Sequence, residues 1–374
     1  MKPAGKRVLL FLLPFLAACA STKLPPHAGA RLQLEEDEKR IWTLAAEAER
    51  RINRSGAVEE APELDAYLAE VARRLFPDLP FACRVRVVRD GGMNAFAFPN
   101  GAIYLHTGIL ARMENEAQLA ALLGHEVTHA VNRHAVRQSR ELKNVSAVYT
   151  AVTLGGYGGG LFTMASVTGY ARDLEREADA EGYRRMVSAG YEASEAGALF
   201  RILERWITET GVRDPYFFSS HPRVRERIES FEGLLAGEPR MGKGVDNRDV
   251  FLSKILRVVL ENTEMDLKAG RFESALRGAE KYLSVAPRDP RGHYVRGEVF
   301  RQRNEGNDLE QAADCYRLAI SSDGSYPEPY RSLGLIHYKR GEKAAARSHL
   351  EKYLALTPGA PDRSYIEGYI RSSQ

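Results

Sequence analysis

The 374-residue sequence predicts a mainly α-helical protein with a small β-sheet, in which a globular domain is followed by an array of paired helices. Apolar residues recur at helical spacing through most of the chain, and strand-like alternation is confined to residues 81–105. Toward the C-terminus a pattern repeats about every 34 residues, which is typical of stacked helical hairpins. These two patterns predict two domains.

The first residues, 1–18, are typical of a bacterial export signal. Three basic residues precede an apolar run over residues 8–18, which is too short to span a bilayer but suits a signal-peptide core. The run ends in Leu-Ala-Ala followed by Cys19, which resembles a lipobox. The resemblance implies lipidation of Cys19 and, because no aspartate follows, an outer-membrane lipoprotein facing the periplasm. The alternative is a plain secretory signal with a chance cysteine.

Behind this signal, residues 19–30 are predicted to be a polar tether between lipid and domain. The chain without residues 1–18 carries 50 basic and 50 acidic residues, so its charge gives no reason to expect nucleic-acid binding. Cys83 and Cys315 fall in different predicted domains. We expect two separate buried thiols, and a periplasmic disulfide remains the alternative.

The globular domain is predicted over residues 31–236 and begins with two charged amphipathic helices and a small sheet. Paired glycines end the first strand, and Pro99 marks the turn of a hairpin or a sheet edge. The expected elements are helices over 31–54, 62–75 and 108–113, and strands over 81–88, 95–98 and 102–105.

One long, largely buried helix is expected over residues 114–137. Asn115 can cap its free amides, and Gln118 can reach back over the same turn. Leucine, valine and alanine then recur at helical spacing. This helix is the centre of the predicted domain.

Within that helix, His125, Glu126 and His129 form the pattern H-E-x-x-H. Four residues make a little over one turn, so both imidazoles leave the same face and can bind one Zn²⁺, while Glu126 lies close enough to act on a water molecule there. A buried helix alone would explain the leucines but not these polar residues, because polar groups cost free energy when they are buried without partners.

A stretch of 28 residues without a charge, 144–171, follows the metal helix. Its length could span a membrane, but six of its residues are glycine. We expect a glycine-hinged lid or helical hairpin beside the active site, with a transmembrane helix as the alternative.

The third metal ligand is expected from a helix over residues 172–186. Glu175 and Asp179 are four residues apart and share one face. One carboxylate can complete a His₂Glu site, and the other can accept the outer N–H of a histidine ligand. Spacing alone leaves Glu177 open as an alternative ligand.

Together these motifs resemble the HtpX-like and CAAX-prenyl-protease-like zinc metallopeptidases. The resemblance covers residues 31–235 and includes H-E-x-x-H, the E-x-x-x-D of the later helix, the hairpin sequence, and Ser-His-Pro around His221 followed by Arg227. It implies a zincin-type domain in which three side chains hold Zn²⁺, Glu126 acts as general base and Asp179 supports a ligand. The implied zinc ligands are His125, His129 and Glu175.

The same resemblance implies a substrate-binding strand and a regulatory histidine. The strand of Ala102, Ile103, Tyr104 and Leu105 is expected to offer its edge to an extended substrate. His221 is implied to be a reversible fourth zinc ligand or an oxyanion stabiliser, and an ordinary surface histidine is the alternative. His106 and His134 are expected to be structural or solvent-exposed, because five residues of helix turn the second of them about 140° away from His129.

Residues 237–248 are predicted to be a linker, and residues 249–374 a tetratricopeptide repeat domain of about three repeats. Ala275, Ala312 and Ala346 mark equivalent positions where paired helices cross. The concave face of such an array binds protein segments. By resemblance, its partner would be the β-barrel assembly machinery.

The sequence therefore predicts a zinc endopeptidase of the bacterial cell envelope that cleaves misfolded or stalled outer-membrane proteins. The alternative is a latent or inactive peptidase that acts as a lipoprotein chaperone or scaffold. An integral membrane prenyl-protein protease would need several long apolar spans, which this sequence lacks.

Overall fold

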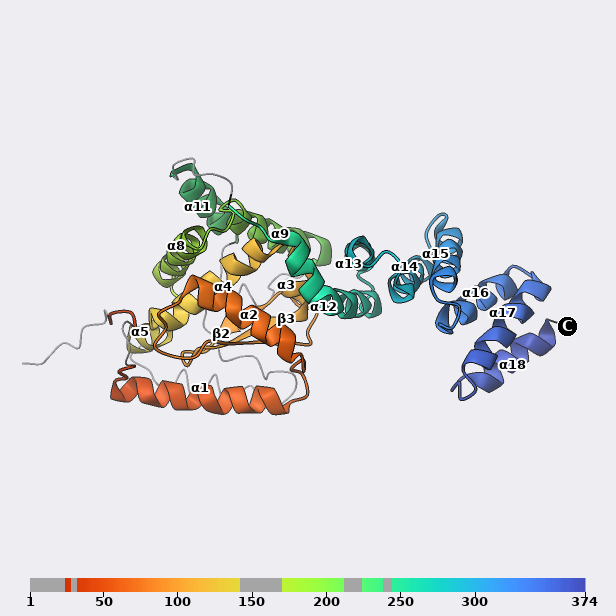
Figure 1. Cartoon of the computed structure of the whole chain (residues 1–374), viewed down its shortest axis with the longest axis horizontal. Helices are drawn as coiled ribbons and strands as arrows, with labels where there is room; N and C mark the ends of the chain where they lie inside the picture. Colours follow the sequence, from red (N-terminus) through yellow and green to blue (C-terminus); the bar gives the residue numbers. More distant parts are fainter. Residues whose placement is uncertain (1–23, 28–31, 142–169, 212–223, 238–243, 374) are drawn as a thin grey trace, which may run out of the picture.

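The computed structural model describes residues 24–27, 32–141, 170–211, 224–237 and 244–373. A globular part built around a small sheet is followed by an arm of paired helices that ends at the C-terminus (Figure 1). The predicted mainly α-helical fold with a small β-sheet is confirmed. The elements of the globular part are α1 (Glu36–Arg54), α2 (Pro62–Leu75), β1 (Arg84–Val88), β2 (Ala95–Ala97), β3 (Ala102–His106), α3 (Thr107–Arg112), α4 (Glu116–Val131), α5 (His134–Glu141), α8 (Arg172–Ser188), α9 (Glu195–Thr210) and α11 (Val224–Gly237).

The three strands are ordered β1-β3-β2, with β1 parallel and β2 antiparallel to β3. The predicted hairpin between β2 and β3 is confirmed, and its turn needs Gly101, whose φ is +82°. The predicted substrate edge is wrong. Because β1 pairs with β3 on the side away from β2, Ala102, Ile103, Tyr104 and Leu105 are buried in a central strand whose backbone is paired on both sides.

Helix α4 begins as the sequence predicts but ends early. The Asn115 side chain accepts a hydrogen bond from the backbone N–H of Gln118 at 2.9 Å, and Gln118 Oε1 accepts from the N–H of Glu114 at 2.8 Å. All 16 residues of α4 are buried. The single helix expected over 114–137 is broken after Val131, because Arg133 adopts a left-handed backbone conformation with φ of 58°.

Helix α8 crosses α4 at a contact between two glycines. A Cβ atom on Gly124 would lie 2.9 Å from the carbonyl oxygen of Gly182, and one on Gly182 would lie 2.7 Å from the backbone nitrogen of His125. Any larger residue at either position would push the helices apart. This close approach brings the start of α8 beside the H-E-x-x-H turn of α4.

The arm begins with α12, which also belongs to the core of the globular part. Phe251, Ile255 and Val259 of α12 are fully buried in the same hydrophobic cluster as Leu110 and Leu119. The helices of the arm are α12 (Arg248–Lys268), α13 (Phe272–Val285), α14 (Pro290–Arg303), α15 (Asp308–Ser322), α16 (Glu328–Lys339), α17 (Lys343–Leu356) and α18 (Arg363–Ser372).

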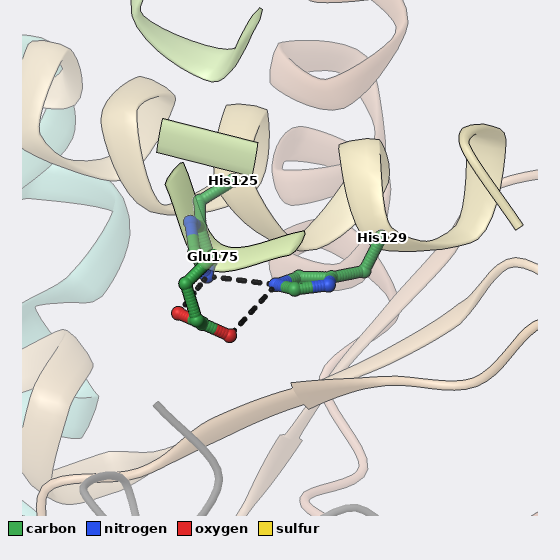
Figure 2. A group of neighbouring side chains, drawn as sticks. All are labelled: His125, His129 and Glu175. Atoms are coloured by element: carbon green, nitrogen blue, oxygen red, sulfur yellow. Dashed lines mark hydrogen bonds and ion pairs between the residues drawn. The ribbon is translucent and has the colours of Figure 1, made fainter. Parts of the chain in front are cut away.

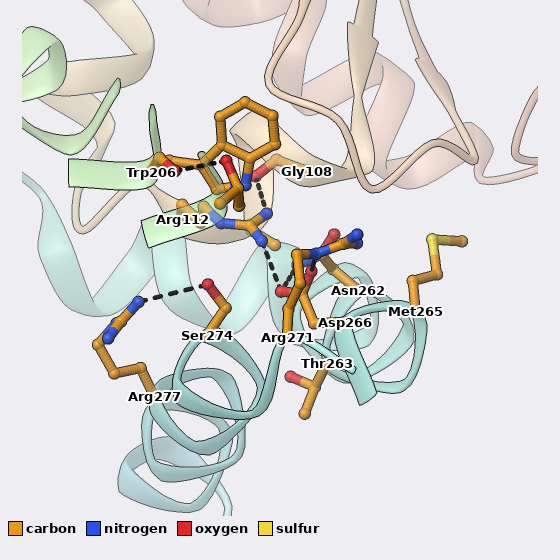
Figure 3. Close-up of polar contacts among 12 residues, drawn as sticks. Gly108, Arg112, Trp206, Asn262, Thr263, Met265, Asp266, Arg271, Ser274 and Arg277 are labelled. Atoms are coloured by element: carbon orange, nitrogen blue, oxygen red, sulfur yellow. Dashed lines mark hydrogen bonds and ion pairs between the residues drawn. The ribbon is translucent and has the colours of Figure 1, made fainter. Parts of the chain in front are cut away.

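A buried polar network adds to this junction (Figure 3). Asp266 of α12 is 1% exposed and accepts hydrogen bonds from Arg112 of α3 at 2.5 Å and from Arg271 at 2.7 Å. Lys281 of α13 donates to the last three carbonyl groups around the end of α3, at 3.0–3.1 Å. The first helix pair of the arm is therefore fixed directly to the segment that precedes the metal helix.

The remaining helices pair as α14 with α15 and α16 with α17, and α18 packs on α17. Ala275, Ala312 and Ala346 are fully buried where the sequence predicts helix crossings.

Cys83 is half-buried and Cys315 buried, and both are free thiols. No helix within the described residues is long and apolar enough to cross a bilayer.

Candidate metal centre

Three side chains from α4 and α8 converge on one point (Figure 2). His125 Nε2 lies 3.0 Å from His129 Nε2, and the Glu175 carboxylate oxygens lie 3.6 Å from the first and 3.5 Å from the second. In a tetrahedral zinc site with ligand bonds near 2.0–2.1 Å, neighbouring ligand atoms are about 3.3 Å apart. The three distances therefore fit a tetrahedral metal ion.

The charge of the site also fits a divalent cation. Among the described residues it buries three carboxylates, those of Glu126, Glu175 and Asp179, against the single guanidinium of Arg227, and each of these residues is at most 5% exposed. Buried charges are normally paired or bound to metals. A divalent cation held by neutral histidines would add positive charge beside these carboxylates.

Asp179 lies directly behind the ligand His125. Its Oδ1 is 2.9 Å from His125 Nδ1, so the carboxylate can accept the ring proton and leave Nε2 free to bind metal. Burial would raise the pKa of Asp179, but the charge of Arg227 and the contact with His125 outweigh it and lower the pKa to about 2. Asp179 is therefore ionised at neutral pH.

Arg227 contributes strongly to the site, although the sequence alone predicted no role for it. It comes from α11 and contacts Asp179 through Nε at 2.9 Å, and its Nη1 lies 3.4 Å from Glu175. Its guanidinium also lies over the Phe200 ring at 4.4 Å. Burial opposes the charged form, but the surrounding carboxylates raise the pKa of Arg227. The only signal in the sequence was its place after the Ser-His-Pro motif.

Glu177, the alternative third ligand, points away from the two ligand histidines. Its carboxylate accepts hydrogen bonds from Asn132 at 2.7 Å and Arg137 at 2.8 Å. Both partners lie beyond the end of α4. Because two residues along a helix are about 200° apart, Glu175 faces the two ligand histidines and Glu177 faces Asn132 and Arg137.

The expectation that His134 points away from the ligand face is wrong. The helix break at Arg133 turns it back, so that its Nδ1 lies 2.9 Å from Nδ1 of His129. His134 is fully buried, and burial lowers its pKa to about 4. Tyr170 stacks on the ring of His129 with centroids 4.0 Å apart.

His106, in contrast, is buried at the end of β3, 3.5 Å from Asp90.

A cleft of about 260 Å³ lies beside the candidate ligands, and Glu175 is one of the residues that line it. It is lined by Tyr170, Arg172, Glu175, Arg176, Asp179, Glu226, Arg227 and Ser230. The expected regulatory residue His221, the lipidation site Cys19 and most of the uncharged stretch, 144–169, lie outside the described residues.

Comparisons with known proteins agree with this geometry. A putative beta-barrel assembly-enhancing protease of Vibrio cholerae is 28% identical over 186 residues, which cover 45% of this chain and 38% of that protein. The mitochondrial metalloendopeptidase OMA1 of Schizosaccharomyces pombe is 29% identical over 45% of this chain and 52% of its own length. The aligned part thus covers about half or less of these relatives.

A crystal structure of MamA, 18% identical, covers 34% of this chain and 85% of its own with a TM-score of 0.27, a likeness too slight to bear on function. The model of peptidase family M48 matches residues 59–235, which contain the candidate metal ligands His125, His129 and Glu175. Residues 59–235 are therefore a domain of peptidase family M48.

Proposed function

We propose that this chain is a zinc-dependent endopeptidase of the bacterial cell envelope that cleaves misfolded or stalled outer-membrane and periplasmic proteins. The observation that carries the proposal is the convergence of His125, His129 and Glu175, with the buried Glu126 next to the first of them on α4. Two imidazoles and one carboxylate are the ligand set of catalytic zinc in peptidases, which leaves one position open.

Zinc bound by these three ligands would polarise the peptide carbonyl and activate a water molecule for attack. Glu126 would take a proton from that water as its oxygen bonds to the carbonyl carbon, and would pass the proton to the nitrogen as the C–N bond breaks. Asp179 would hold His125 in the tautomer that keeps Nε2 unprotonated. Arg227 would keep Asp179 ionised and oriented.

The cellular role is proposed from the relatives and from the sequence. One relative is named as a putative beta-barrel assembly-enhancing protease. This name supports the proposal that the substrates are proteins of envelope assembly. The lipobox at Cys19 supports an outer-membrane anchor facing the periplasm. The arm of α12–α18 would dock protein partners, the β-barrel assembly machinery among them. His221 would regulate the site as a reversible zinc ligand or assist as an oxyanion stabiliser.

Metal content and proteolysis of an unfolded protein such as casein test the proposal together. The purified chain should hold one zinc and cleave casein, and Glu126→Gln should keep the zinc and lose the cleavage. Glu181→Gln is the matched control, because Glu181 is a half-buried carboxylate of α8 that pairs with Arg184 and Arg185, and it should leave both the zinc content and the cleavage unchanged. Absence of bound metal in the parent chain would contradict the site, whereas bound metal without cleavage would favour the chaperone or scaffold function.

A further inference from the structure

His129 has a partner that differs in kind from that of the other ligand histidine. We infer that His134 is a positioning residue for the metal site: it accepts the outer ring proton of His129 and links that ligand to the carboxylate of Glu177. The inference rests on the proposed metal site. His134 is neither one of the proposed metal ligands nor the proposed general base, so the inference adds a residue to the site.

The tautomers follow from the contacts. Nε2 of His129 faces His125 and Glu175, so it must be unprotonated to bind metal, and Nδ1 must carry the proton. Within the described part of the chain, Nδ1 of His134 lies 2.9 Å from this nitrogen and can accept its proton. His134 must then be protonated at Nε2, which lies 3.6 Å from the Glu177 carboxylate.

The carboxylate of Glu177, beyond His134, is itself held in place. Glu177 accepts hydrogen bonds from Asn132 and Arg137, so its carboxylate is held toward His134 and away from the metal. His134 is fully buried, whereas the Glu177 side chain is 36% exposed. A carboxylate near the surface therefore lies beside the buried ring of His134, 3.6 Å from its Nε2 and beyond direct hydrogen-bond distance.

A special backbone conformation makes the contact possible. In a continuous helix the fifth residue after His129 would point about 140° away from it. Arg133 is in the left-handed region instead, which is uncommon for a residue with a side chain. Its buried guanidinium is paired with Glu38 of α1, which holds the turn in place. The ion pair thus aims His134 at the ligand.

The two ligand histidines are consequently supported in different ways. His125 has an ionised carboxylate, Asp179, directly against its Nδ1, whereas Nδ1 of His129 faces the imidazole of His134. Groups that orient a metal-binding histidine usually contribute ten- to a hundredfold to metal affinity. His134 should contribute within that range, and Glu177 less.

Zinc affinity of the full, metal-stripped chain, measured by competition with a chromophoric chelator, tests the inference. His134→Leu removes the acceptor and should weaken zinc binding about ten- to a hundredfold. His134→Asn places an oxygen acceptor near the position of Nδ1 and should recover most of the loss. His106→Leu, which removes another buried histidine, should leave the affinity unchanged.

Equal affinity in the parent chain and His134→Leu would overturn the inference, and so would equal losses in His134→Leu and His134→Asn. If His134→Leu fails to fold, Glu177→Gln replaces it. A smaller loss of zinc affinity is expected from this variant, and an unchanged affinity would overturn the inference. In the zinc-bound parent chain, nitrogen NMR should find His129 protonated at Nδ1. Zinc binding that survives His125→Leu would instead contradict the metal site itself.

Discussion

Arg227 and Asp179 are joined by a buried, two-pronged ion pair between helices α11 and α8. Each residue is at most 5% exposed, and the pair lies directly behind the ligand His125. Because α11 is distant in sequence from α4, this contact lets a distant helix influence the ionisation and orientation of the carboxylate beside His125.

Removal of the arginine should therefore cost both stability and metal binding. Arg227→Ala would leave a buried carboxylate without its counter-charge, and breaking such a pair typically costs about 3–5 kcal/mol. Urea unfolding should show a loss of that size. Arg225→Ala, at an 84% exposed position of the same helix, is the control and should change stability by less than about 0.5 kcal/mol. Similar losses in both variants would contradict the role of the buried pair.

A second buried carboxylate should make the stability depend on pH. Glu116, at the start of α4, accepts hydrogen bonds from Tyr67 at 2.6 Å, Tyr191 at 2.9 Å and Asn247 at 2.8 Å, and pairs with Arg74. Burial raises its pKa, but these contacts outweigh it, so the pKa lies below the ordinary value of 4.5. A lowered pKa stabilises the fold above the unfolded value, and this stability is lost as the pH falls through the folded value.

Glu116→Gln should therefore lower the free energy of unfolding at pH 7 by about 1.5–3 kcal/mol, the usual contribution of hydrogen bonds to a charged group. The difference from the parent chain should shrink as the pH falls from 4.5 through the lower pKa of the folded state, because the parent carboxylate then becomes neutral, as the Gln amide already is. Urea unfolding at several pH values measures this. Glu63→Gln, at an exposed position of α2, should show no such convergence.

The parts of the site that repeat along a helix were predictable from the sequence. His125 and His129 are one turn apart, and so are Glu175 and Asp179, so helical geometry alone gives each pair a common face. The capping of α4 by Asn115 was equally local. Each of these predictions depends only on residues within one turn of each other.

The predictions that were wrong depended on contacts between distant segments. His134 returns to the site because Arg133 is held in a left-handed conformation by Glu38, which is 95 residues away in the sequence. The strand Ala102–His106 is central because β1 pairs with it in parallel, and no local pattern specifies that pairing. The sequence also contained no sign that Arg227 is buried against Glu175, Asp179 and the Phe200 ring, because these residues come from other helices.

Metal removal should destabilise the globular part. A ligand that binds only the folded chain stabilises it by about 4 kcal/mol when its concentration is a thousand times its Kd. A strong chelator should therefore lower the Tm of the parent chain by several degrees. His129→Ala, which lacks one ligand, should melt at the same temperature with and without the chelator. An equal chelator effect on both chains would show that the metal binds elsewhere.

The boundary between the two domains can also be tested, because α12 is shared between them. Phe251, Ile255, Val258 and Val259 are each at most 2% exposed within the core of the globular part. Full burial of one such side chain contributes about 1.5–3 kcal/mol, so losing four of them would remove most of a typical stability of about 5–15 kcal/mol. The predicted linker at 237–248 is therefore a poor place to divide the protein.

A chain that ends at residue 237 should not fold into a metal-binding domain, whereas a chain that ends at residue 286 retains α12 and α13 and should do so. The longer chain also keeps Lys281, whose three hydrogen bonds hold the end of α3 just before the metal helix. Circular dichroism, thermal melting and zinc content of the two chains measure the difference. If the shorter chain melted cooperatively within a few degrees of the longer one and bound one zinc, α12 would be an accessory of the repeat arm and not a part of the peptidase core.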